Sequence, residues 1–252
     1  MCFVLVLYRV HPEYPIVVAA NREERRDRPA TPPHAWDTSP RIWAGRDEVA
    51  GGTWLGANEM GLVVAITNRR GEGNDPNAPS RGGLCLGALR EPSAAAAKEY
   101  LARVVARQRF NPFNLIALDG EQAWAANRLG QVTQLDAGIH VIVSQGDVDD
   151  SRLARVRRGQ RLARGLHAAK LALPELLDGL AGICANQTKP DPICRPGGIR
   201  GTVSSSLIAL DRQGKLTAYW HAPGPPCAQG YGAVELNELA TTAARRLETP
   251  SP

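Results

Sequence analysis

The sequence predicts an α+β sandwich whose terminal strands lie inside it. Apolar, β-branched segments occur near both ends of the chain, and segments with helical periodicity lie between them. The 252 residues include 43% hydrophobic residues and no segment typical of an interdomain linker, so the chain is long enough to bury one large core. We therefore expect a single domain over residues 1–247 and a frayed tail over residues 248–252.

Nine segments have the apolar pattern of strands. They are 3–9, 16–21, 42–46, 62–68, 113–118, 122–127, 138–143, 202–210 and 215–221. The first two are close enough in sequence to pair as a hairpin. Such a hairpin would place the end of the second strand beside the N-terminus.

Three segments favour helices: 92–107, 151–168 and 174–183. The first opens with Pro92-Ser93, residues typical of a helix start, and continues with an alanine-rich run. In the second, Arg155 and the arginines near it fall opposite the apolar face, so we expect them on a solvated surface. Two loops rich in Arg, Pro, Gly and Asn are long enough to act as lids, at 25–40 and 69–83.

Composition argues against several classes of protein. All but four of the 30 basic residues are arginine, and no nucleic-acid-binding motif accompanies the net charge of +5. The five cysteines have no C-x-x-C spacing, so we expect reduced thiols, no metal site and a cytoplasmic location. The first apolar run ends at Arg9 with no basic region before it, and this predicts neither a signal peptide nor a membrane span.

The second residue, Cys2, is a candidate nucleophile. A side chain as small as cysteine normally allows removal of the preceding Met1, which would leave a thiol beside a free α-amine. An α-amine titrates near ~7.7–8.0 and a free thiol near ~8.5, so the amine can accept the thiol proton as sulfur attacks a carbonyl. The alternative is that Cys2 is a small buried hydrophobic residue of a strand.

Polar residues follow two of the predicted strands. Strand 16–21 leads into Asn21-Arg22-Glu23-Glu24, where alternation places Arg22 and Glu24 on one face of the strand. Near Cys2, an arginine would stabilise a thiolate and a carboxylate would anchor the amine or the arginine. Asn68, at the end of strand 62–68, can donate to an oxyanion. The alternative for the Asn-Arg-Glu-Glu segment is a charged strand end at the surface.

These residues together resemble the Transport and Golgi organization protein 2 family, also called NRDE after its motif. The resemblance is carried by Met1-Cys2, Asn21-Arg22-Glu23-Glu24, Arg28-Pro29, Trp36, Gly45-Arg46-Asp47, Gly51-Gly52-Thr53-Trp54-Leu55-Gly56, Gly61 and Thr67-Asn68-Arg69. It is specific over about the first 85 residues, and it implies the αββα four-layer sandwich of the N-terminal-nucleophile hydrolases. The chain departs from the family at Glu23, Gln145 and Val203, where Asp, Asn and Arg are usual.

The resemblance also implies roles for individual residues. The catalytic set would be Cys2 as nucleophile, Arg22 and Glu24 as its electrostatic partners, and Asn68 and Gln145 on the oxyanion side. The substrate-binding set would be Asn21, Trp54 and Arg69.

Two functions fit the resemblance. The first is a cysteine amidohydrolase that cleaves a small non-peptide amide through a Cys2 thioester and requires no cofactor. The second is a carrier that binds haem or a lipid-related ligand in the same cleft, for intracellular trafficking. Cysteine and histidine can ligate haem iron, and the candidates are Cys2, His11, His34, His140, His167 and His221. Either function implies a small-molecule partner, and the sequence leaves the oligomeric state open.

Overall fold

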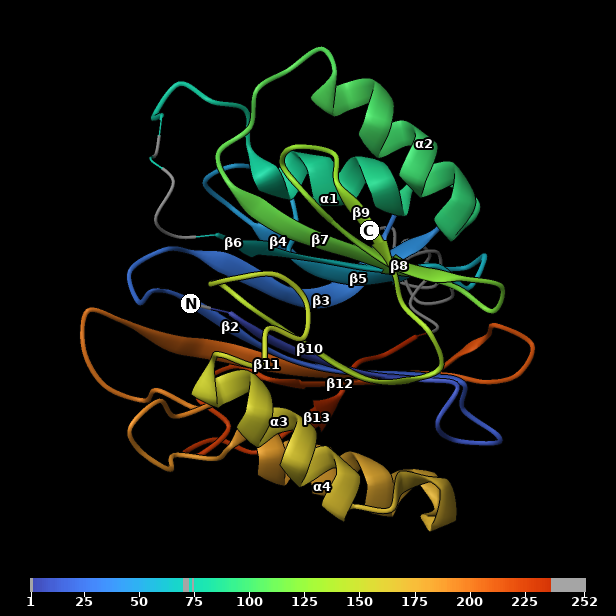
Figure 1. Cartoon of the computed structure of the whole chain (residues 1–252), viewed down its shortest axis with the longest axis vertical. Helices are drawn as coiled ribbons and strands as arrows, with labels where there is room; N and C mark the ends of the chain where they lie inside the picture. The colour runs from blue at the N-terminus through green and yellow to red at the C-terminus, as the bar shows by residue number, and fades with distance from the viewer. Residues whose placement is uncertain (1, 70–72, 74, 237–252) are drawn as a thin grey trace, which may run out of the picture.

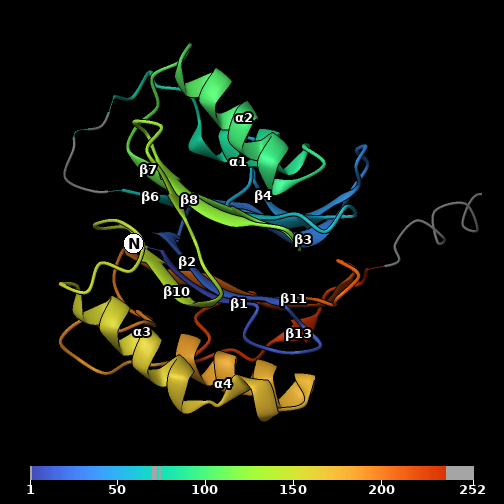
Figure 2. The same ribbon diagram turned by 45° about the vertical axis from the view of Figure 1, so that its right-hand side comes forward.

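Two antiparallel sheets face each other, with helices on the outer surface of each, in a computed structural model of the chain (Figure 1). The structure describes residues 2–69, 73 and 75–236. One pair of helices covers the seven-stranded sheet and another pair covers the six-stranded sheet, and Figure 2 shows the four layers from a second direction. The αββα sandwich expected from the sequence is confirmed.

The six-stranded sheet has the order β10-β1-β2-β11-β12-β13. Its strands are β1 (Phe3–Tyr8), β2 (Ile16–Arg25), β10 (Gly138–Val143), β11 (Arg200–Leu210), β12 (Leu216–Ala222) and β13 (Gly232–Ala233). The predicted hairpin is confirmed, because β1 pairs with β2 and Phe3 faces Asn21. On its other side, Phe3 faces Val143 of β10. Cys2 therefore enters the sheet between two strands.

The seven-stranded sheet follows the chain in the order β3-β4-β5-β6-β7-β8-β9. Its strands are β3 (Ala30–Trp36), β4 (Ile42–Asp47), β5 (Leu55–Asn58), β6 (Val63–Asn68), β7 (Phe113–Leu118), β8 (Ala123–Asn127) and β9 (Val132–Gln134). The prediction of a loop over 25–40 was wrong, because β3 lies within it. The segment contains Pro32 and Pro33, which a strand tolerates only at an edge or an irregularity. β3 is an edge strand, and its register shifts between Thr31 and His34.

The helices are α1 (Arg81–Leu89), α2 (Ala94–Val105), α3 (Ala154–Gly165), the short 3₁₀ helix η1 (Ala168–Lys170) and α4 (Leu173–Cys184). The three predicted helices and nine predicted strands are confirmed, with small differences at their ends. In α2, the side chain of Ser93 caps the helix by accepting a hydrogen bond from the backbone N–H of Ala96. α1 was not predicted, because Gly82, Gly83 and Gly87 are poor helix formers.

The two faces of β1 and β2 pack against different layers. Val4, Val6 and Val18 point to the other sheet and belong to the core between the sheets. Phe3 and Leu5 point to α3 and α4. This alternation decides which residues of the strand ends can reach a site between the sheets.

Two further expectations concern the C-terminal tail and membrane-spanning segments. The predicted tail 248–252 lies outside the described residues. Within the described part of the chain, each helix is too short or too polar to cross a bilayer.

The buried His221 on β12 predicts a loss of stability in acid. Burial lowers the pKa of His221 to about 4, and its Nδ1 is hydrogen-bonded to Ser206 Oγ at 2.9 Å. As pH falls from the usual histidine pKa through this value, the unfolded chain binds a proton that the folded chain does not. Through this group, the free energy of unfolding should fall by roughly 3 kcal/mol over that interval.

The measurement is the free energy of unfolding from urea denaturation, at pH 7 and at a pH equal to the lowered His221 pKa of about 4. It compares wild type with His221→Gln, whose side chain cannot take up that proton. The variant should lose less stability on acidification than wild type does. Equal losses in the two proteins would show that His221 does not cause the effect.

Candidate active site

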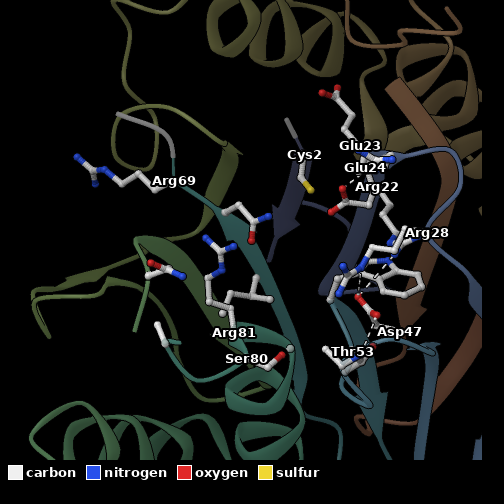
Figure 3. Close-up of a pocket in the computed structure, with 18 of the residues that line it drawn as sticks. Cys2, Arg22, Glu23, Glu24, Arg28, Asp47, Thr53, Arg69, Ser80 and Arg81 are labelled. Carbon is white, nitrogen blue, oxygen red and sulfur yellow. Dashed lines mark hydrogen bonds and ion pairs between the residues drawn. The ribbon is translucent and has the colours of Figure 1, made fainter. Parts of the chain in front are cut away.

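A cleft of ≈ 810 Å³ lies at one end of the sandwich, where β1 begins (Figure 3). Its walls come from the start of β1, the end of β2, the segment from β4 to β5, the end of β6 and the start of α1. Cys2 lines this cleft, and its side chain is half-buried. Six arginines also line it: Arg22, Arg25, Arg28, Arg69, Arg81 and Arg200. The cleft therefore combines a thiol with an excess of positive charge.

The backbone nitrogen of Cys2 is held in place by Ser144. It donates a hydrogen bond to Ser144 Oγ at 2.7 Å, and Ser144 is only 1% exposed. Asn114 fixes the backbone on both sides of this serine, because its Nδ2 donates to the carbonyls of Val143 at 3.2 Å and Gly146 at 3.1 Å. An α-amine at the same nitrogen would keep this acceptor.

Burial raises the pKa of the Cys2 thiol above its usual range, and the charge of Glu23 adds to that effect. The backbone N–H of Glu23 and the charge of Arg22 act in the opposite direction without reversing it. The expected stabilising effect of Arg22 on a thiolate is therefore present, but burial outweighs it. At neutral pH the thiol is protonated, so attack by sulfur requires a base that accepts its proton.

The predicted alternation along the end of β2 is confirmed. Arg22 and Glu24 line the cleft. The Asn21 side chain lies on the opposite face, where its Nδ2 donates to the carbonyls of Cys184 and Ile193 at 2.9 and 3.0 Å. Glu23 extends away from Cys2 in Figure 3 and forms an ion pair with Arg155 of α3.

Asp47 and Trp54 position Arg22. The Arg22 guanidinium lies over the Trp54 ring, 4.3 Å from its centroid, and its Nη2 is 3.8 Å from Asp47 Oδ2. The same carboxylate accepts a hydrogen bond from Arg28 Nε at 2.8 Å. Gly45 leaves room for the tryptophan, because a Cβ there would lie 2.7 Å from the indole.

The glycine-rich segment after Asp47 packs against the start of α1. A Cβ on Gly52 would lie 2.2 Å from the backbone carbon of Gly82, so only glycine fits without a shift of the backbone. The backbone N–H of Thr53 donates to the Gly82 carbonyl at 3.1 Å. This contact explains the Gly-Gly-Thr motif physically, because it fixes Arg81 beside the cleft.

The structure brings together most of the residues that the sequence predicted for the site. Cys2, Arg22, Glu24, Trp54, Asn68 and Arg69 line the cleft. Asn21 does not, because its side chain is buried on the helix side of the sheet. Gln145 is exposed and does not line the cleft either. Of the predicted oxyanion-side amides, only Asn68 faces the space beside Cys2.

Arg200 supplies a cation near Val203, where the sequence departs from the pattern of the family it resembles. Val203 lies where the pairing of β11 with β2 shifts register, between Thr202 and Ser204. Arg200 lines the cleft, and its Nη1 is 3.2 Å from Glu24 Oε1. Arg200 therefore places a positive charge in the cleft on the strand that carries Val203.

Several residues of the site were not assigned from the sequence. Ser144 was assigned no role, although its hydroxyl accepts the hydrogen bond from the Cys2 nitrogen. Arg81 falls in a segment that was interpreted as a loop, and a Ser-Arg-Gly-Gly helix start is a weak signal. Arg155 was expected on a solvated surface, but it is 1% exposed. Its carboxylate partner is on β2, which no local pattern in the helix reveals.

Solved structures with the same architecture define the class of fold. A conjugated bile acid hydrolase variant from Clostridium perfringens aligns with a TM-score of 0.59 at 10% identity, over 94% of this chain and 93% of that chain. Penicillin V acylase from Agrobacterium tumefaciens aligns with a TM-score of 0.57 at 15% identity, over 94% and 87%. The N-acylethanolamine-hydrolyzing acid amidase ortholog of Caenorhabditis elegans gives 0.52 at 11% identity, over 82% and 92%. The chain therefore has the N-terminal-nucleophile hydrolase fold.

Sequence comparison identifies the family within this fold. The model of the Transport and Golgi organisation 2 family matches residues 1–232, and the chain belongs to that family. The mouse Transport and Golgi organization 2 homolog is 33% identical over 127 residues, which are 47% of this chain and 45% of that protein. The human homolog is 32% identical over the same shares of the two chains. The matched region thus spans about half the length of these curated relatives.

Proposed function

We propose that this protein is an N-terminal cysteine amidohydrolase that cleaves a small non-peptide amide. One observation carries the proposal: the Cys2 thiol lines the cleft while its own backbone nitrogen is anchored on Ser144 Oγ at 2.7 Å. Removal of Met1 would turn that nitrogen into an α-amine, so that nucleophile and base would belong to one residue. The raised pKa of the thiol supports a mechanism that needs such a base.

The reaction begins when the Cys2 sulfur attacks the carbonyl carbon of the amide. The thiol proton passes to the α-amine, and the carbonyl oxygen becomes an oxyanion. Asn68 lines the cleft, and its amide has no hydrogen-bond partner among the described residues, so it can donate to this oxyanion. The C–N bond then breaks, and the leaving amine takes the proton from the α-ammonium. Water attacks the Cys2 thioester, releases the acid and restores the thiol.

The carrier alternative has less support in the cleft. Arginine side chains could pair with the carboxylates of a haem, and Cys2 could supply one iron ligand. However, none of the five histidines of the sequence is among the residues that line the cleft. Four of them are hydrogen-bonded elsewhere: His11 to the Leu171 carbonyl, His34 to the Pro32 carbonyl, His140 to Asp149 and His221 to Ser206. The site therefore fits haem through one axial ligand only.

A cytoplasmic location is part of the proposal. All five cysteines are free thiols, and unpaired cysteines are usual for proteins in a reducing compartment. A thiol nucleophile also needs that compartment to remain reduced.

The test uses the full chain as expressed. Intact mass should show loss of Met1, and a panel of N-acyl amino acids and acyl-lactams should yield free amine with a transient acyl group on Cys2. Retention of Met1 in the bulk of the protein would overturn the mechanism. A saturable one-to-one haem titration without turnover on any member of the panel would favour the carrier instead.

A further inference from the structure

Arg81 differs from the other arginines of the cleft in its partners. Its guanidinium donates through Nη1 to the Pro112 carbonyl at 3.0 Å. Among the residues that the structure describes, no carboxylate forms an ion pair with it. Burial lowers the pKa of Arg81, while the charges of Glu24 and Cys2 raise it in part. Arg81 is thus a partly desolvated cation in the same cleft as the nucleophile, with donors that have no acceptor in the described part of the chain.

The other five cleft arginines each have a carboxylate partner. Arg22 and Arg28 share Asp47, Arg25 pairs with Asp27, Arg69 with Asp147, and Arg200 with Glu24. Glu23, which also lines the cleft, is paired with Arg155 from the helix layer. Among the residues that the structure describes, these five arginines share four carboxylates, and Arg81 is the cleft arginine for which no carboxylate partner is found. A bound anion would neutralise the charge of Arg81.

The position of Arg81 is rigid, which favours specific recognition. It is the first residue of α1, whose buried side chains Leu84 and Leu89 pack on the seven-stranded sheet. The following residue, Gly82, is in backbone contact with Gly52 and Thr53. In Figure 3, Arg81 extends from the start of this helix into the cleft. A guanidinium held in this way presents a planar fork that matches the two oxygens of a carboxylate.

We propose that Arg81 binds a carboxylate of the substrate, and that the substrates are N-acyl amino acids. This inference rests on the proposed amidohydrolase function for the identity of the scissile bond, but carboxylate binding itself requires no chemistry at Cys2. Because Arg81 and Cys2 line the same cleft and Arg81 extends into it (Figure 3), a carboxylate on Arg81 belongs to the same ligand as the amide that Cys2 attacks. The α-carboxylate of an N-acyl amino acid occupies that position.

The test compares N-octanoylglycine with N-octanoylglycinamide, which have the same acyl chain and differ only in the terminal group, an anionic carboxylate in the first and a neutral carboxamide in the second. Binding is measured by calorimetry on Cys2→Ala, so that turnover plays no part. The carboxylate should bind ~10- to 100-fold more tightly than the amide, as expected for a charge-assisted hydrogen-bonded pair. Adding Arg81→Met should abolish this preference and leave the glycinamide affinity unchanged. Arg81→Lys, which keeps the charge but not the fork, should retain only part of it.

Arg25→Met is the matched control, because Arg25 lines the cleft but is already paired with Asp27 at 2.5 Å. It should retain the preference for the carboxylate. Equal affinity of the protein for the two ligands would overturn the inference. So would an equal loss of affinity for both ligands in the Arg81→Met variant, and so would tighter binding of octyl phosphate than of N-octanoylglycine. If the preference is found but wild type neither hydrolyses the amide nor forms an acyl adduct, the carboxylate site is supported and the proposed reaction fails.

Discussion

Substituting Cys2 with alanine will lower amide turnover by ~10³-fold or more, as loss of a covalent nucleophile does in other hydrolases. The reason is that no other side chain of the cleft can replace the covalent step. Ser80 and Thr53 also line the cleft, but neither carries the α-amine that would activate an adjacent hydroxyl. The measurement is the rate of glycine release from N-octanoylglycine at saturating substrate, for wild type and for Cys2→Ala with confirmed mass.

The matched control is Cys227→Ala, the same substitution at the other half-buried cysteine, which does not line the cleft. Its turnover should equal that of wild type. Turnover in Cys2→Ala within about tenfold of wild type would mean that binding and oxyanion contacts alone account for catalysis, and the thioester mechanism would fail.

The arrangement around Cys2 could be predicted from local sequence because it depends on two adjacent strands. The β1–β2 hairpin and the alternation of side chains are enough to place Arg22 and Glu24 on the same side of the sheet as Cys2. Asn68 follows the same logic at the end of β6. Where the family pattern assigned a role without such geometry, as for Asn21 and Gln145, the structure places the side chain elsewhere.

The parts that sequence patterns missed depend on contacts between distant segments. β3 forms because its prolines fall at the edge of a sheet that the local sequence does not reveal. The glycines at the start of α1 disfavour a helix locally, yet Gly82 is needed for the close contact with Gly52. Arg155 was assigned to a solvated face by helical periodicity, because its carboxylate partner lies far away in the sequence on β2. Tertiary contacts therefore decided each of these outcomes.

The ion pair between Glu23 and Arg155 predicts the largest effect on stability. Both side chains are 2% exposed, and Arg155 Nη2 also donates to the Ile193 carbonyl at 2.7 Å. Arg155→Met keeps most of the side-chain volume but removes the guanidinium that faces the buried Glu23 carboxylate. Such a loss should lower the free energy of unfolding by ~3–5 kcal/mol, measured by guanidinium chloride denaturation with circular dichroism.

Two further variants separate the charge from the packing. Arg161→Met, at an exposed position of the same helix, should change the free energy of unfolding by less than ~0.5 kcal/mol. Glu23→Gln combined with Arg155→Met removes both charges, so it should recover much of the stability that the single Arg155 variant loses. If the double variant is as unstable as Arg155→Met alone, the cost comes from lost packing and not from the loss of the opposite charge beside Glu23. Glu23 lies between Arg22 and Glu24 on β2. In that case, packing of the Arg155 side chain, and not its charge, would hold the end of this strand beside Cys2.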